Sequence, residues 1–327
     1  MVLVLVEQSE GRATDPSLQT LTVARSFGQP VHALLVGSSV DLGHHGVAVS
    51  HVAENEALGS FAPDAWAAIL GELAELLDAT AVFAAGTERG NEVMARLAAR
   101  AGVPLATNCI AVAPGTPVAL TRLRWGGSLL EEARLHSSRP LITVAPHTVP
   151  IETAPVETKV EKFSPSVSDG DLLVRVAEHV GASGGGISLT EAKVVVSGGR
   201  GVGSKEGFAI IEELAGLLGA AVGCSRAVTS AGWRPHTDQV GQTGTKIAPD
   251  IYIACGISGA TQHMAGCKGA KKILAINADG EAPIMLSADY AVIGDLKEIV
   301  PAISAEIRAQ IPAHAPLPGL LPEGERG

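Results

Sequence analysis

Aromatic residues and cysteine are scarce in this chain. Of its 327 residues only 3% are Phe, Trp or Tyr, whereas 46% are hydrophobic, so a core must be built mainly from Ala, Val, Leu and Ile. The cysteines are scattered, and none forms a Cys-x-x-Cys pair. We therefore expect structural thiols in a reducing, cytoplasmic compartment, and neither a disulfide framework nor a metal site. The cysteines are Cys109, Cys224, Cys255 and Cys267.

Positive charge and long apolar runs are also lacking. The formal net charge is −10, and Lys and Arg form no block, which argues against nucleic-acid binding through a basic face. No apolar run approaches the length that crosses a membrane, so no membrane insertion is expected. The opening apolar segment is interrupted by Glu7 and follows no basic stretch. We interpret it as a buried strand rather than a signal peptide.

The first half of the chain alternates short apolar segments with amphipathic ones. This rhythm predicts a parallel sheet with helices on its faces. From Val118 shorter alternating pieces predict antiparallel strands added to a sheet edge, and 156–163 predicts one exposed strand. His44, His45 and His51 are expected in a solvated loop region. The predicted strands are 2–6, 31–36, 80–84 and 109–112, and the predicted helices are 18–27, 63–77 and 92–101.

A glycine-rich segment divides the chain. Gly184, Gly185 and Gly186 are consecutive, a composition typical of a flexible hinge, and the α/β rhythm restarts at Lys193. We predict an α/β protein of two domains, each with a largely parallel sheet flanked by helices, the second of them doubly wound. The N-terminal domain spans 1–183, the hinge 184–189 and the C-terminal domain 190–327.

Three predicted strands of the second domain end in glycine or polar residues. The strand 251–254 runs into a turn at Gly256, and a helix begins near Gly259. The next strands end at Asn277 and Asp295. A glycine turn at a helix start leaves backbone N–H groups free for a phosphate or another anion. Parallel strands present their ligands at this carboxyl edge, so a nucleotide site is predicted here.

A further glycine loop follows the strand 193–197. It contains a loose G-x-G-x-x-x-G, formed by Gly201, Gly203 and Gly207, and could cradle a pyrophosphate, as in a nicotinamide-binding unit. Such a unit requires an acidic residue at the end of the next strand to hold the ribose hydroxyls. That position carries Ser225 and Arg226 instead. An arginine could accept a 2′-phosphate, so NADP stays possible while the NAD interpretation is weakened.

The second domain resembles the alpha subunit of electron transfer flavoprotein. The resemblance covers the whole domain in order and at family-like spacing, and the first domain matches more loosely through its strand pattern and Gly86-Thr-Glu-Arg-Gly90. In the first domain Ala145 stands where many relatives have an arginine. The runs that carry the resemblance are Ser197-Gly-Gly-Arg-Gly, Gly223-Cys-Ser-Arg-Ala227, Gln239-Val-Gly-Gln-Thr-Gly244, Gly256-Ile-Ser-Gly-Ala-Thr-Gln-His263, Ala275-Ile-Asn277 and Ala288-Asp-Tyr290.

The resemblance implies an FAD held mostly by the second domain, in a heterodimer with a beta subunit against which the first domain packs. The partner would hold AMP or a second FAD. Carried over position by position, the residues that contact FAD are Arg200, Ser225, Arg226, Val240, Gly241, Gln242, Thr243, Ser258, Gly259, Ala260, Thr261, Gln262, His263, Asn277 and Asp295.

Three of these residues, Arg226, Thr243 and His263, are expected to tune the flavin. Arg226 is always charged and planar, so it can stack on the ring and neutralise the negative charge of its reduced form. Thr243 could donate to flavin N5, and Gln262 could bind a carbonyl or ribityl hydroxyl. A lone histidine is more often a core residue, but the place of His263 inside the motif favours a ring that faces the flavin.

The resemblance favours an electron carrier rather than an enzyme. FAD would accept electrons from dehydrogenases of the acyl-CoA dehydrogenase type, as in fatty acid oxidation, and pass them to a quinone oxidoreductase. One alternative is a subunit of a flavin-based electron-bifurcating complex that reacts with NADH. Another is an NADP-binding domain of the transhydrogenase or thiamine-enzyme type. No Ser-His-Asp or paired-carboxylate arrangement can be assembled, so hydrolytic chemistry is not supported.

Overall fold

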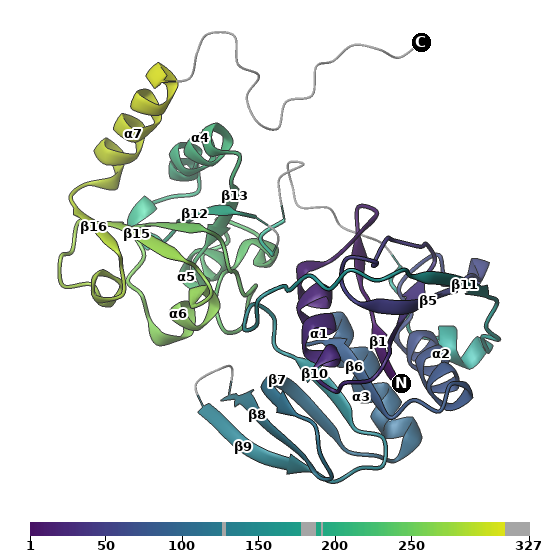
Figure 1. Cartoon of the computed structure of the whole chain (residues 1–327). Helices are drawn as coiled ribbons and strands as arrows, with labels where there is room; N and C mark the ends of the chain where they lie inside the picture. The colour runs from purple at the N-terminus through teal and green to yellow at the C-terminus, as the bar shows by residue number, and fades with distance from the viewer. Residues whose placement is uncertain (126–128, 178–187, 191, 311–327) are drawn as a thin grey trace, which may run out of the picture. The chain divides into compact units, whose positions relative to one another are not determined.

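The computed structural model describes residues 1–125, 129–177, 188–190 and 192–310. The chain divides into two compact units, Met1–His179 and Val180–Gly327, which are described separately (Figure 1). Most of the predicted hinge, 184–187, lies outside the described residues, so its boundaries stay a prediction. No helix in the described part of the chain is long and apolar enough to cross a membrane.

The first unit is built on a nine-stranded sheet in the order β11-β5-β4-β1-β6-β10-β7-β8-β9. Neighbouring strands are parallel except for β7, β8 and β9, which pair antiparallel as predicted. A short antiparallel pair, β2 (Gln8–Ser9) and β3 (Arg12–Ala13), lies outside this sheet. The strands are β1 (Val2–Leu5), β4 (Val31–Val36), β5 (Val47–Ala53), β6 (Ala81–Ala85), β7 (Leu105–Ala113), β8 (Val118–Arg124), β9 (Leu129–Leu135), β10 (Leu141–Val144) and β11 (Lys159–Phe163).

Helices cover both faces of this sheet. Helix α1 (Asp15–Arg25) contributes Leu21 and Ala24 to the apolar cluster on one face. Helices α2 (Pro63–Leu76) and α3 (Glu88–Ala101) pack on the other face. Helix α3 begins four residues before the predicted start at residue 92, because the Thr87 hydroxyl accepts from the backbone N–H of Gly90 and caps it.

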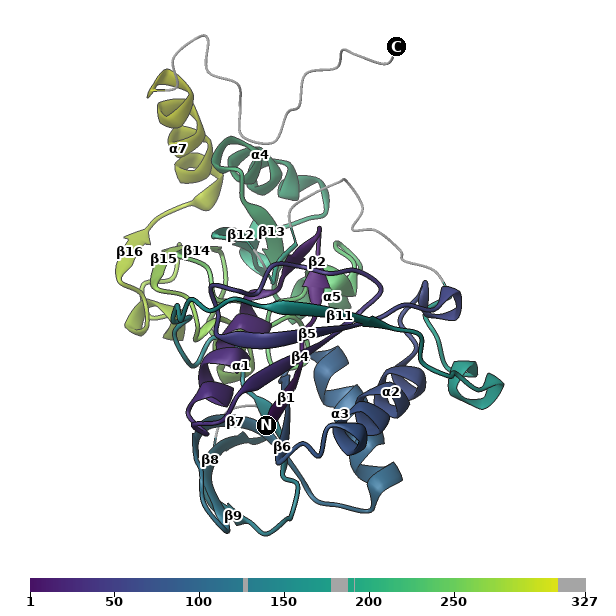
Figure 2. The same ribbon diagram turned by 45° about the vertical axis from the view of Figure 1, so that its right-hand side comes forward.

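The prediction that 44–51 is a solvated loop region is wrong for its second half. Strand β5 lies between β4 and β11 (Figure 2), and His51 is 4% exposed. Its Nε2 is 3.0 Å from Nδ1 of His32, and burial lowers its pKa. Ser50 and His51 interrupt the apolar alternation of this strand, so the sequence pattern did not predict it. His44 is exposed, as predicted, whereas His45 is half-buried. Strand β11 is the exposed edge strand that was predicted.

The second unit contains a five-stranded parallel sheet in the order β13-β12-β14-β15-β16. Helices α4 and α7 pack on one face, and α6 packs on the other, so the sheet is doubly wound. The strands are β12 (Val194–Gly198), β13 (Ala221–Cys224), β14 (Ile251–Cys255), β15 (Lys272–Asn277) and β16 (Tyr290–Ile293), and the helices are α4 (Ala209–Leu218), α5 (Arg226–Ser230), α6 (Thr261–Cys267) and α7 (Leu296–Gln310).

All four cysteines are buried free thiols. Burial raises the pKa to about 12 for Cys109, Cys224 and Cys255, and to about 11 for Cys267. Because the thiolate is the reactive form, we expect dithionitrobenzoate at about pH 8 to modify none of them in the native protein. In denaturant it should release four equivalents of chromophore. Fast modification of even one thiol in the native state would contradict this burial.

Candidate functional site

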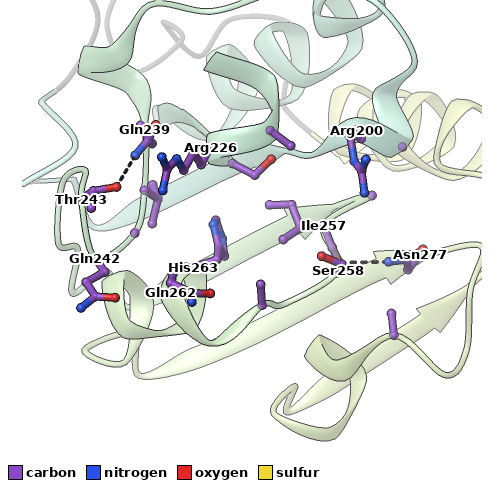
Figure 3. Close-up of a pocket in the computed structure, with 18 of the residues that line it drawn as sticks. Arg200, Arg226, Gln239, Gln242, Thr243, Ile257, Ser258, Gln262, His263 and Asn277 are labelled. Carbon is purple, nitrogen blue, oxygen red and sulfur yellow. Dashed lines mark hydrogen bonds between the residues drawn. The ribbon is translucent and has the colours of Figure 1, made fainter. Parts of the chain in front are cut away.

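A pocket of about 380 Å³ opens at the carboxyl ends of β12, β13, β14 and β15 in the second unit (Figure 3). Its volume falls in the usual range for small-molecule sites. Twelve of the predicted site residues line it: Arg200, Ser225, Arg226, Val240, Gly241, Gln242, Thr243, Ser258, Ala260, Gln262, His263 and Asn277.

Two glycine loops meet at one end of the pocket. The N–H of Gly201 donates to the carbonyl of Gly256 over 3.1 Å. A Cβ on Gly199 would lie 2.2 Å from the same carbonyl oxygen, so no larger residue fits. Gly256 has φ +63°, a conformation that glycine adopts without strain. Arg200 lies between Gly199 and Gly201 on the first of these loops, where it is exposed and lines the pocket.

The loop from Ser258 to Gln262 presents backbone donors. Within the described part of the chain, none of its N–H groups has an acceptor. Two contacts hold the loop in place: Ile284 N–H donates to the Ser258 carbonyl over 3.1 Å, and Asn277 Nδ2 donates to the Ile257 carbonyl over 2.9 Å. Consecutive free N–H groups are a typical site for an anion.

The loop 239–244 forms the opposite wall and rests on α6. The N–H of Gln242 donates to the Gln262 carbonyl over 2.7 Å. The side chain of Gln239 is buried, and its Nε2 donates to Thr243 Oγ1 over 3.1 Å. Since Thr243 Oγ1 already accepts this bond, its own proton is available to a ligand.

The pocket carries more positive than negative charge. Arg200 and Arg226 both line it and are exposed, and neither has a carboxylate within 4.0 Å among the described residues. Asp279 is the acid in the lining, and its Oδ1 accepts from the N–H of Glu281. The pocket therefore favours an anionic ligand.

His263 contributes a neutral ring. It is 7% exposed, and its Nε2 lies 2.7 Å from the hydroxyl of Tyr252. Burial lowers its pKa to about 4, against the smaller opposing effect of the Val240 carbonyl. The other ring nitrogen, Nδ1, is buried and has no hydrogen-bond partner among the described residues. A buried polar atom needs a hydrogen-bond partner, so in a pocket wall it indicates that a ligand or a water molecule binds there.

Comparison with known proteins identifies the family. Residues 188–268 match the family described as "Electron transfer flavoprotein FAD-binding domain", and residues 2–168 match "Electron transfer flavoprotein domain". The "Electron transfer flavoprotein subunit alpha" of Mycobacterium leprae is 40% identical over 94% of this chain and 98% of its own length. The protein of that name from Bacillus subtilis is 36% identical over 96% of this chain and 99% of its own. "Protein FixB" of Clostridium saccharobutylicum is 38% identical over 96% and 98%.

The chain belongs to the electron transfer flavoprotein alpha subunit family. Its second unit carries the family's FAD-binding domain, so FAD is its cofactor. The pocket suits this group. Arg200 and a row of N–H groups without acceptors among the described residues match a pyrophosphate, Arg226 adds positive charge, and an orphan ring nitrogen lies in the wall.

Three predicted residues do not line the pocket. Asp295 Oδ1 accepts from the N–H of Lys297 at the start of α7. Thr261 is the exposed first residue of α6, and Gly259 is buried against Ile284, where a Cβ would lie 2.5 Å from the Ile284 nitrogen. Their contact with FAD stays a prediction.

The pocket also contains residues that sequence reasoning did not select. The motifs already contained five of them, and their positions beside predicted residues were the available signal. Asp279 and Ala282 follow β15 and carried no motif. The unselected lining residues are Gly201, Ala227, Gln239, Gly256, Ile257, Asp279 and Ala282.

Proposed function

We propose that this chain is the alpha subunit of a heterodimeric electron carrier and holds FAD in the pocket of its second unit. Bound FAD supplies one- and two-electron redox chemistry, and the protein sets its potential and its access. The observation that carries the proposal is the pocket itself. Arg200, Arg226 and the N–H groups from Ser258 to Gln262, which have no partner within the described ranges, meet around one cavity at the carboxyl edge of a parallel sheet.

The chain's residues divide the work of binding FAD. Arg200 and the Ser258–Gln262 loop are placed to bind the pyrophosphate, since charge and N–H donors gather there. Arg226 supplies fixed positive charge at the start of α5, where it would stabilise the negative charge of a reduced flavin. Thr243 and His263 supply single, uncharged donors to the ring. This fixed positive field would hold electrons on the flavin between partners.

The partners follow from the family. Relatives are named as a subunit alpha, which supports a heterodimer with a beta subunit. In this proposal FAD takes electrons from dehydrogenases of the acyl-CoA dehydrogenase type, as in fatty acid oxidation, and delivers them to a quinone oxidoreductase. A carrier needs no catalytic acid or base. In the pocket, His263 is neutral and the Asp279 carboxylate accepts a hydrogen bond from its own loop.

A bifurcating complex that reacts with NADH is the second candidate. The two candidates differ in the partner, because a carrier's beta subunit would hold AMP and a bifurcating one a second FAD.

The test is the cofactor content of the heterodimer, co-expressed with the beta subunit of the same organism. We expect a yellow complex with one FAD and one AMP per heterodimer. Two FAD would support the bifurcating candidate. A colourless complex that binds NADP would overturn both candidates. The chain expressed alone is the control, and it should lose FAD on a sizing column, because half of the flavin site would face water.

A further inference from the structure

Tyr252 is a buried strand residue that contacts His263, which lines the pocket. It lies on β14, at the centre of the second sheet, and is 0% exposed. Its hydroxyl is 2.7 Å from Nε2 of His263, and the two rings are tilted by 34° with centroids 6.0 Å apart. Figure 3 shows the His263 ring rising from α6 on the side of the pocket that carries Arg226. A phenol in the sheet therefore fixes a ring in the pocket wall.

The neighbours of His263 determine where its proton lies. A neutral imidazole has one N–H and one acceptor nitrogen, and the hydrogen bond at one nitrogen sets the other. Burial raises the pKa of Tyr252 well above its usual value, so the phenol keeps its proton and can donate it. The Val240 carbonyl near the ring can only accept, which favours an N–H on the ring. Tyr252 can then donate to Nε2 while Nδ1 carries the proton. By hydrogen-bond geometry Nδ1 has no partner among the described residues, so the Val240 carbonyl lies near the ring without accepting its N–H.

We propose that Tyr252 is a positioning residue that holds His263 as the neutral Nδ1–H tautomer, so that an unpartnered N–H is kept in the wall of the pocket for an acceptor atom of the ligand. The proposal rests on the proposed FAD site, and it explains why Nδ1 of His263 has no hydrogen-bond partner among the described residues. A buried N–H without an acceptor is unfavourable in the empty pocket, and a ligand oxygen or nitrogen that meets it removes that cost.

The remaining polar groups around Tyr252 do not replace this bond. The Ser197 hydroxyl near the phenol lowers the Tyr252 pKa against the effect of burial, and among the described residues it makes no hydrogen bond, to the His263 ring or elsewhere. The thiols of Cys255 and Cys267 are buried and protonated, since burial raises their pKa to about 12 and about 11. Loss of the Tyr252 hydroxyl would thus leave Nε2 without a strong donor, and the imidazole could carry its proton on either nitrogen.

The experiment compares Tyr252→Phe with Tyr290→Phe in the heterodimer. The chain has two tyrosines, and Tyr290 is 61% exposed on β16, so it is a matched control. The tautomer is measured by long-range ¹H–¹⁵N correlation on ¹⁵N-histidine-labelled protein, with and without FAD. The His263 signal is assigned from its loss in His263→Gln. FAD affinity and flavin potential are measured in parallel.

We expect the parent and Tyr290→Phe to show the Nδ1–H pattern without FAD. Tyr252→Phe should populate both tautomers and bind FAD about three- to tenfold more weakly, as loss of one fixed hydrogen bond implies. An Nε2–H pattern in the parent, or an unchanged pattern and affinity in Tyr252→Phe, overturns the proposal. If Tyr252→Phe does not fold, the parent spectrum alone decides. If the parent binds no FAD, the proposed function fails, while the spectrum without FAD still tests the tautomer.

Discussion

Arg226→Ala is expected to lower the flavin midpoint potential by several tens of millivolts, up to about 100 mV, while FAD stays bound. A shift of 100 mV corresponds to about 2.3 kcal/mol per electron, which one partly desolvated charge can supply. Arg226 lines the pocket and has no carboxylate within 4.0 Å among the described residues, so no internal counter-ion cancels its charge. The measurement is a spectroelectrochemical titration of the heterodimer.

Two variants separate charge from structure in this experiment. Arg226→Lys keeps the positive charge and loses the planar stacking, so it should keep most of the parent potential. Arg200→Ala removes the other exposed arginine, at the pocket end where two glycine loops meet. It should weaken FAD binding more than it changes the potential. If Arg226→Ala leaves both one-electron potentials at the parent values, Arg226 has a structural role and the electrostatic account is wrong.

The parts of the fold that could be predicted are those that a short stretch of sequence specifies. Strand β4 has the predicted bounds because it is an apolar run between Pro30 and Gly37. Strand β5 was missed because Ser50 and His51 are polar residues that are buried in it. Only the pairing of this segment with β4 and β11 shows that it is a strand. Pairing partners far apart in sequence are not visible in a local pattern.

The same limit applies to the site. The motifs located the four loops because glycines with close backbone contacts leave a direct trace in the sequence. They did not show which side chains of these loops point into the pocket. Asp295 caps α7, whereas Asp279, which carried no motif, lines the pocket. The partner of His263 is Tyr252, a strand residue that would ordinarily be assigned to the core. Side-chain direction depends on how the loops pack on each other, which the sequence alone does not specify.

The largest effect on the pocket is expected from Gly266→Ala, which should reduce FAD affinity at least tenfold and lower the free energy of unfolding of the second unit by about 1–3 kcal/mol. Gly266 lies in α6, and a Cβ there would be 2.3 Å from the Gly241 nitrogen and 2.4 Å from its Cα. These neighbours are backbone atoms, which cannot rotate away as a flexible side chain could. The substitution must push the 239–244 loop off α6.

That displacement would separate groups on which the pocket depends. The loop is attached to α6 through the Gln242 N–H and the Gln262 carbonyl, and the N–H of Ile247 donates to the Gly266 carbonyl over 2.8 Å. The loop also carries Thr243 and Val240, so the donor proposed for flavin N5 and the carbonyl beside His263 would move together. Affinity should therefore fall by more than the loss of one contact.

Gly216→Ala is the matched control, because it makes the same change in a helix of the same unit. Gly216 lies in α4, and a Cβ there meets no atom within 4 Å. Alanine is the better helix former, so this variant should gain up to about 1 kcal/mol and bind FAD as the parent does. Urea unfolding and FAD titration of both variants provide the test. If Gly266→Ala matches Gly216→Ala in both measurements, α6 and the 239–244 loop have room between them, and the close backbone contact does not shape the pocket.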